Sequence, residues 1–152
     1  MATIIKQTDK DREGVLSRAG QSATQLDTNN FNGVGVNKPW GYEYLMYEDK
    51  SVAIWMLYIK RGHSTSMHCH PKKKSSLLML SGNAITSTLN ESFNLKEKDG
   101  IIIDKGVFHK TESISDGGIF LIELETPPDK MDLFRLKDQY KRETQGYTLK
   151  KN

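Results

Sequence analysis

Short apolar runs separated by polar residues fill the chain from Lys38 onward. The runs are rich in β-branched and aromatic residues, and clusters of Gly, Asn, Asp, Ser and Lys lie between them, which is typical of strands joined by turns. They cover residues 51–60, 76–82, 83–90, 92–96, 100–104 and 118–125. Many short strands at nearly even spacing predict an all-β sandwich or barrel.

Turn and breaker residues divide the chain into three parts. Ser81-Gly82-Asn83 and Asp116-Gly117-Gly118 are expected to form hairpin turns. Residues 17–37 are polar and lack periodicity, so we expect a loosely ordered N-terminal arm over residues 1–37. The Pro127-Pro128 pair is expected to end the barrel of residues 38–126. Residues 127–152 would then pack on it as a tail, either as a short amphipathic helix or as extended chain.

Composition excludes several classes of protein. The chain has 152 residues, which suits one domain, and its net charge is only +3, with the excess in residues 127–152. We therefore expect neither nucleic-acid binding nor a polybasic membrane anchor. The sequence has no apolar run long enough to span a membrane, no secretory signal and a single cysteine, Cys69. These features favour a soluble protein of the reducing cytoplasm.

Three of the four histidines lie in "GHSTSMHCHPKKKSSLLMLSG", residues 62–82. In a strand, His68 and His70 would share one face and Cys69 would point to the other. Two imidazoles on one face can bind Zn, Cu, Fe or Ni, with further ligands from elsewhere in the chain. His109 is the remaining candidate, although a single histidine on a strand is more often a hydrogen-bonded structural residue.

The order of these pieces resembles the two sequence motifs of the cupin superfamily. The first motif has a glycine, a His-x-His pair, a glutamate and a second glycine, and the chain places Ser75 where the glutamate is usual. Residues 98–113, "KDGIIIDKGVFHKTES", resemble the second motif. The positions in register are Gly62, His68, His70 and Gly82 in the first motif, and Asp99, Gly106 and His109 in the second.

Two flanking segments narrow the resemblance. "KPWGYEYL" (38–45) and "DLFRLKDQYKR" (132–142) are similar to segments that bracket the C-terminal cupin domain of type II mannose-6-phosphate isomerase/mannose-1-phosphate guanylyltransferase. The resemblance implies a cupin double-stranded β-helix, a jelly-roll barrel, with a metal held by His68, His70 and His109. It also implies a homodimer in which N-terminal arms cross between subunits.

The serine at position 75 changes what the site is expected to do. Three histidines can still hold a divalent ion such as Zn, Mn, Ni or Fe, but the carboxylate that could move a proton is missing. His63, Glu112 and Glu123 are the candidates for that proton transfer. Lys73 lies near a family arginine and Arg135 matches another, so the resemblance implies that both bind substrate, although Arg135 could instead fasten the tail. Trp40, Trp55, Tyr42 and Tyr44 could stack on a sugar ring or belong to the core.

The resemblance implies a metal-dependent isomerase or epimerase that acts on a phosphorylated or nucleotide-linked sugar. Two alternatives remain open: a three-histidine iron dioxygenase acting on a small molecule, and a non-catalytic sugar- or anion-binding protein with a degenerate metal site. No part of the chain resembles a nucleotidyltransferase domain, so guanylyltransfer is not expected.

Overall fold

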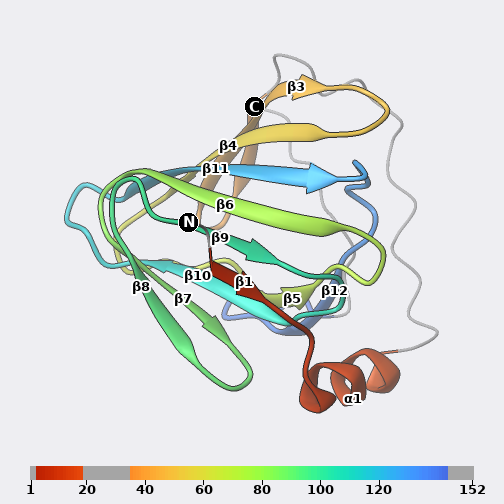
Figure 1. Cartoon of the computed structure of the whole chain (residues 1–152). Coiled ribbons are helices and arrows are strands. Elements are labelled where there is room, and N and C mark those ends of the chain that lie inside the picture. Colours follow the sequence, from red (N-terminus) through yellow and green to blue (C-terminus); the bar gives the residue numbers. More distant parts are fainter. Residues whose placement is uncertain (1–2, 19–34, 144–152) are drawn as a thin grey trace.

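A computed structural model describes residues 3–18 and 35–143. Within these ranges the chain forms twelve strands in two sheets and one helix (Figure 1). The all-β prediction is therefore confirmed. The elements are β1 (Thr3–Ile5), α1 (Asp9–Ser17), β2 (Gly35–Lys38), β3 (Gly41–Glu48), β4 (Ala53–Ile59), β5 (Met67–Cys69), β6 (Lys74–Ser81), β7 (Ala84–Thr88), β8 (Ser92–Leu95), β9 (Gly100–Ile103), β10 (His109–Ser113), β11 (Ile119–Thr126) and β12 (Phe134–Lys137).

The larger sheet has seven strands in the order β1-β9-β6-β11-β4-β3-β2, and the smaller has five in the order β12-β5-β10-β7-β8. All pairings are antiparallel except that of β1 with β9. The predicted turn at Ser81-Gly82-Asn83 joins β6 to β7, and Gly82 has a φ of 82°, a conformation that favours glycine. Gly118, before β11, has a φ of 78° for the same reason.

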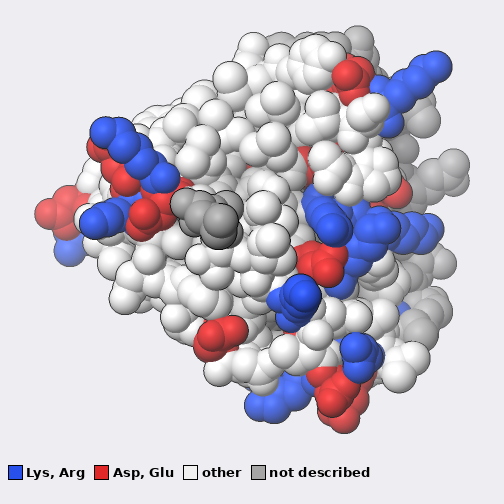
Figure 2. All heavy atoms as spheres, in the orientation of Figure 1, with Lys and Arg blue, Asp and Glu red and all other residues white. Residues whose placement is uncertain are grey.

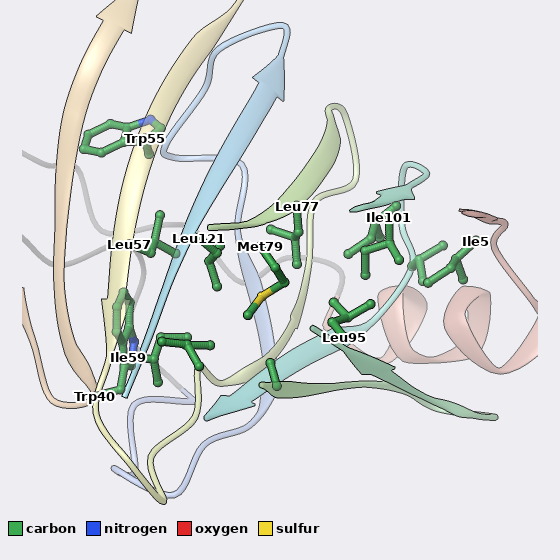
Figure 3. Packing of buried hydrophobic residues seen from close by; sticks show 14 of the residues in the cluster. Ile5, Trp40, Trp55, Leu57, Ile59, Leu77, Met79, Leu95, Ile101 and Leu121 are labelled. Carbon is green, nitrogen blue, oxygen red and sulfur yellow. The ribbon is translucent and has the colours of Figure 1, made fainter. Parts of the chain in front are cut away.

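The hydrophobic core lies between the two sheets and is built mainly from alternate residues of the long strands. On β4, Trp55, Leu57 and Ile59 are buried, and Leu121 of β11 and Met79 of β6 pack beside them (Figure 3). Successive side chains of a strand point to opposite faces, so each of these strands has one face in the core and one outside it. Residues 53–59 follow this alternation without interruption.

The described N-terminal part of the expected arm forms regular structure. β1 extends the larger sheet by pairing with β9, and α1 is started by a capping box between Thr8 and Asp11. Asp11 is buried, and its Oδ1 accepts a hydrogen bond of 2.7 Å from the backbone N–H of Phe108. These long-range contacts fix residues 3–17, which local sequence cannot reveal. Residues 19–34 lie outside the described residues.

The described part of the C-terminal segment follows the extended-chain alternative. After β11, Phe134–Lys137 forms the edge strand β12, which pairs with β5, so the sheet region does not end at Pro127-Pro128 and the described part of the tail is not a helix. Asp138 and Arg142 then form a buried ion pair, with Nε and Oδ2 2.6 Å apart. In the described ranges, no helix is long and apolar enough to cross a membrane.

Candidate metal centre and its pocket

Three histidines from different parts of the chain meet inside the barrel. His68 of β5 is the register partner of His109 at the start of β10, and His70 comes directly after β5. One ring nitrogen from each lies within 4.8 Å of the others. The structure therefore brings together the three residues expected to bind metal, and it is the alternation of β5 that turns His68 and His70 toward the same space.

The backbone fixes the orientation of all three rings. Each Nδ1 lies close to a carbonyl oxygen: 2.7 Å for His68 and Ser66, 2.6 Å for His70 and Asp132, and 2.9 Å for His109 and Val107. A carbonyl only accepts, so each Nδ1 carries the proton and each Nε2 keeps its lone pair. Hydrogen bonds of this kind orient metal-binding imidazoles in proteins.

The environment keeps the rings neutral. Burial lowers the pKa of His109 from 6.5 to about 4, and burial also lowers the pKa of His68 and of His70 well below 6.5. Nε2 of His70 is buried and has no hydrogen-bond partner among the described residues. A buried nitrogen lone pair without a donor is what a metal ligand needs, so this donor set fits a divalent ion held by His68, His70 and His109.

A buried carboxylate from another strand lies near the histidines. Glu123 of β11 lines the same pocket, and its Oε1 lies 4.0 Å from Nε2 of His70. Burial raises the pKa of Glu123, and the nearby Lys130 opposes that rise. Ser75, in contrast, is buried on β6 but does not line the pocket. Of the three proton-transfer candidates, Glu123 is the one that the fold brings to the histidines.

The other two candidates lie elsewhere. His63 lies outside the pocket, and its Nδ1 is 2.8 Å from the hydroxyl of Tyr140, so it contacts the C-terminal segment. Glu112 lies on β10 between the inward-facing Thr111 and Ser113, and so faces outward. Its Oε2 is 3.8 Å from Nζ of Lys110. Strand alternation turns Glu112 away from the histidines, and neither His63 nor Glu112 lies in the pocket that the three histidines line.

Behind Glu123 lies a cluster of charges that the sequence analysis missed. Nζ of Lys130 lies 2.6 Å from Glu125, 3.8 Å from Glu123 and 3.9 Å from Glu43. It also lies 3.9 Å from the ring centroid of Trp55. Although burial alone lowers the pKa of Lys130, attraction to the three glutamates outweighs it and raises the pKa. The sequence signal that could have revealed this cluster is the presence of glutamates at inward positions of β3 and β11.

Further basic groups give the pocket an excess of positive charge. Lys73, predicted to bind substrate, is buried with its Nζ 3.0 Å from Glu125, and Lys38 lies 3.5 Å from Glu43. Arg135, the second predicted substrate residue, also lines the pocket. With Lys130 and Arg142, the lining has five basic and three acidic side chains, and the charge of Arg142 is balanced by Asp138 just outside it. This balance favours an anionic ligand.

Solved structures similar to this chain share its fold at low sequence identity. The capsular polysaccharide assembling protein CapF from Staphylococcus aureus has a TM-score of 0.62 and 16% identity, over 69% of this chain and 34% of that one. Lactobacillus farciminis oxalate decarboxylase has a TM-score of 0.60 and 18% identity, over 67% and 33%. KdgF from Halomonas sp. has a TM-score of 0.59 and 13% identity, over 67% and 96%. The chain thus spans about a third of the length of the first two proteins.

Sequence comparison identifies the family. No functionally curated protein matches the chain. The sequence profile described as "Mannose-6-phosphate isomerase C-terminal" matches residues 25–138, which include all three histidines, Glu123 and Arg135. Together with the shared cupin fold, this match means that the chain belongs to the mannose-6-phosphate isomerase C-terminal family of cupins.

Proposed function

We propose that this protein is a metal-dependent isomerase or epimerase that acts on a sugar phosphate or a similarly anionic sugar. The observation that carries the proposal is the meeting, in one pocket, of three neutral imidazoles and the buried carboxylate of Glu123. Aldose–ketose isomerisation needs a group that polarises a carbonyl and a base that moves a proton between adjacent carbons. A divalent ion bound by His68, His70 and His109 would supply the polarisation.

Glu123 is assigned the proton transfer. Its carboxylate lies beside the histidines, and burial raises its pKa, which makes it a better base than an exposed glutamate. Lys130, 3.8 Å away, favours the ionised form that accepts the proton. The glutamate of β11 thereby takes over a role for which Ser75 lacks the chemistry.

In this proposal, the basic side chains of the pocket bind the anionic part of the substrate. Burial, followed by repulsion from Arg142, lowers the pKa of Arg135 to about 10, and burial lowers the pKa of Lys38 to about 8. Both shifts reflect the cost of holding positive charge in the buried pocket, which an anionic group of the substrate would reduce. A phosphate fits this requirement because an arginine can donate to two of its oxygens.

The test combines metal analysis with turnover. The metal content of untagged protein is measured by elemental mass spectrometry, and aldose and ketose phosphates are then assayed for interconversion. We expect near-stoichiometric metal and measurable isomerisation, both lost in His68→Ala/His70→Ala. Stoichiometric iron with oxygen uptake and no isomerisation would replace the proposal with an oxygenase. Ligand-dependent stability without any turnover would replace it with a binding protein.

A pair of variants tests the role of Glu123. Glu123→Gln should reduce kcat by at least about 100-fold while keeping the metal, because general acid–base groups contribute roughly 10²–10⁴-fold. Glu112→Gln, on the outward face of β10, is the matched control and should retain activity. Loss of metal from Glu123→Gln would instead make Glu123 a ligand, and unchanged kcat would remove it from the mechanism.

A further inference from the structure

The turn between β9 and β10, residues 104–108, carries a group that positions one of the three histidines. Nδ1 of His109 donates to the carbonyl of Val107, two residues earlier, at 2.9 Å. The backbone N–H of Gly106 donates to the carbonyl of His70 at 2.8 Å. The β9–β10 turn therefore orients one histidine and is hydrogen-bonded to a second, so a shift of this turn would move the two rings relative to each other.

The N-terminal segment holds both ends of the β9–β10 turn. At its start, the N–H of Asp104 donates to the carbonyl of Ile5, where β1 ends, at 3.0 Å. At its other end, the N–H of Phe108 donates to Oδ1 of Asp11 at 2.7 Å. Asp11 lies 97 positions before Phe108 in the sequence, so the turn depends on a distant segment for these restraints.

The helix α1 contacts the barrel through one narrow face. Its buried residues are Asp11 and Gly14, which are three positions apart and therefore share a face of the helix. Its exposed residues include four charged ones: Asp9, Lys10, Arg12 and Glu13. Figure 2, in the orientation of Figure 1, shows side chains of both charges over this helix. The face that carries Asp11 and Gly14 is thus the one that acts on the barrel.

Gly14 allows the helix to approach the ring of Phe108. A Cβ added at Gly14 would lie 2.5 Å from Cε2 of Phe108, whereas carbon atoms that are not bonded prefer about 3.5–4.0 Å. The Phe108 side chain is fully buried, so it cannot turn into solvent to make room. Alanine favours a helix more than glycine does, so the close contact, rather than helix formation, accounts for glycine at this position.

The end of α1 also reaches the strand beside a second histidine. Nη2 of Arg18, the residue after the helix, donates to the carbonyl of Leu136 on β12 at 3.0 Å. The preceding residue of β12, Arg135, is the register partner of His68 on β5. The helix is therefore connected to chain segments on either side of the histidine cluster.

We propose that Asp11 and Gly14 are positioning residues for the metal centre, an inference that rests on the proposed function. They hold Phe108, and with it the carbonyl of Val107 that keeps the proton of His109 on Nδ1. Without these contacts the turn would lose its lateral restraint. The ring would then also populate the tautomer with the proton on Nε2, which has no lone pair on that nitrogen for a metal.

Two measurements on the full chain test this role. Chelator-treated protein is titrated with Zn²⁺, and the tautomer of His109 in the metal-free protein is read from long-range ¹H–¹⁵N NMR spectra. Asp11→Ala should lower the Zn²⁺ affinity by roughly 10–100-fold, as does the loss of other groups that orient metal ligands. It should also give a mixture of tautomers. Asp9→Ala, which removes an exposed carboxylate from the same turn of α1, is the matched control and should change neither result.

A conservative variant separates positioning from stability. In Asp11→Asn the amide oxygen can still accept from the N–H of Phe108, but Nδ2 cannot accept from the N–H of Thr8 as Oδ2 does. This variant should therefore lose the helix cap and some stability, yet keep the wild-type tautomer of His109 and a Zn²⁺ affinity closer to that of the wild type than to that of Asp11→Ala.

Gly14→Ala tests the contact with the ring independently. It should lower the Zn²⁺ affinity although alanine favours the helix, because its Cβ displaces Phe108. Adding Phe108→Leu removes the ring atoms that this Cβ would meet, so the double variant should regain part of the affinity. Near-UV circular dichroism establishes that each variant is folded, and Gly14→Ala carries the test if Asp11→Ala does not fold.

The outcomes distinguish this role from the proposed function. Folded Asp11→Ala and Gly14→Ala variants with the affinity and the His109 tautomer of the wild type would overturn the inference. Equal losses of affinity in Asp11→Ala and Asp11→Asn would also overturn it, because they would follow stability alone. A wild type that binds no metal would refute the proposed function instead, and the tautomer of His109 would then decide whether α1 positions the ring.

Discussion

The backbone carbonyl of Asp132 accepts a 2.6 Å hydrogen bond from Nδ1 of His70, although the two residues are 62 positions apart in sequence. The carboxylate of Asp132 faces the same loop, since its Oδ2 accepts hydrogen bonds from the backbone N–H groups of Lys72 (2.8 Å) and Lys73 (3.0 Å). The segment after β11 thus orients His70, a proposed metal ligand, and also fixes the backbone of Lys72 and Lys73, which follow His70 in the chain.

Replacing Asp132 with alanine should therefore weaken both folding and metal binding. Two backbone donors, one of them buried, lose their acceptor, which should lower the free energy of unfolding by about 1–3 kcal/mol. The looser loop should lower metal affinity by roughly 10-fold or more. Urea denaturation and a metal titration measure the two effects. Asp116→Ala, which removes an exposed carboxylate paired with Arg61, is the control, and equal losses in both variants would refute the prediction.

Two aspartates in the first turn of α1 allow a matched comparison. Asp11 is buried, caps the helix with Thr8 and accepts from the N–H of Phe108, next to His109. Asp9 contacts only the exposed Arg12 in the described structure. Asp11→Asn should lower the free energy of unfolding by about 1–3 kcal/mol, while Asp9→Asn should change it by less than roughly 0.5 kcal/mol. Chemical denaturation measures both free energies of unfolding. Similar values for Asp11→Asn and Asp9→Asn would mean that the contacts of Asp11 do not stabilise the barrel.

Local patterns were sufficient for most of the barrel. The apolar runs predicted β4, β6, β7, β8, β9 and β11, and the turn residues predicted the β6–β7 hairpin. Alternation alone placed His68 and His70 on one face, because strand geometry depends only on neighbouring residues. The meeting of these residues with His109 needed the cupin motifs, since a register between β5 and β10 cannot be calculated from either segment alone.

Features that depend on distant partners were missed. β1 is three residues long and exists because β9, almost a hundred positions later, provides its hydrogen bonds. β12 was not expected because Phe134–Lys137, although its apolar and polar residues alternate, is only four residues long, and its partner β5 lies far away in the sequence. The buried glutamates of β3 and β11 look like surface residues until Lys130 is placed between them.

The buried histidines should make the metal-free protein sensitive to acid. The pKa of His109 is about 4 when folded and near 6.5 when unfolded, so between these values the unfolded chain binds a proton that the folded chain does not. The contribution of His109 to stability is thus complete above pH 6.5 and is lost as the pH falls toward 4, by roughly 3 kcal/mol in total. Denaturation of chelator-treated protein at several pH values measures it. His109→Asn should flatten the decline, and an unchanged slope would contradict the assignment.

Removing the charge of Glu125 should be the most destabilising of these changes. Its carboxylate lies 2.6 Å from Nζ of Lys130 and 3.0 Å from Nζ of Lys73, and all three side chains are almost fully buried. Glu125→Gln leaves two buried ammonium groups short of a counter-charge, which should lower the free energy of unfolding by about 3–5 kcal/mol.

Two comparisons test whether the loss of stability comes from this buried ion pair or from removing any negative charge. Glu97→Gln removes a largely exposed partner of Lys98 and should change the stability by less than about 1 kcal/mol. Adding Lys73→Met to Glu125→Gln should recover part of the loss, because the ammonium group of Lys73 that Glu125 had balanced is then gone. Urea denaturation of the four proteins provides the comparison. If the double variant were no more stable than Glu125→Gln alone, Lys73 would not depend on Glu125, and its charge would have to be balanced elsewhere in the pocket.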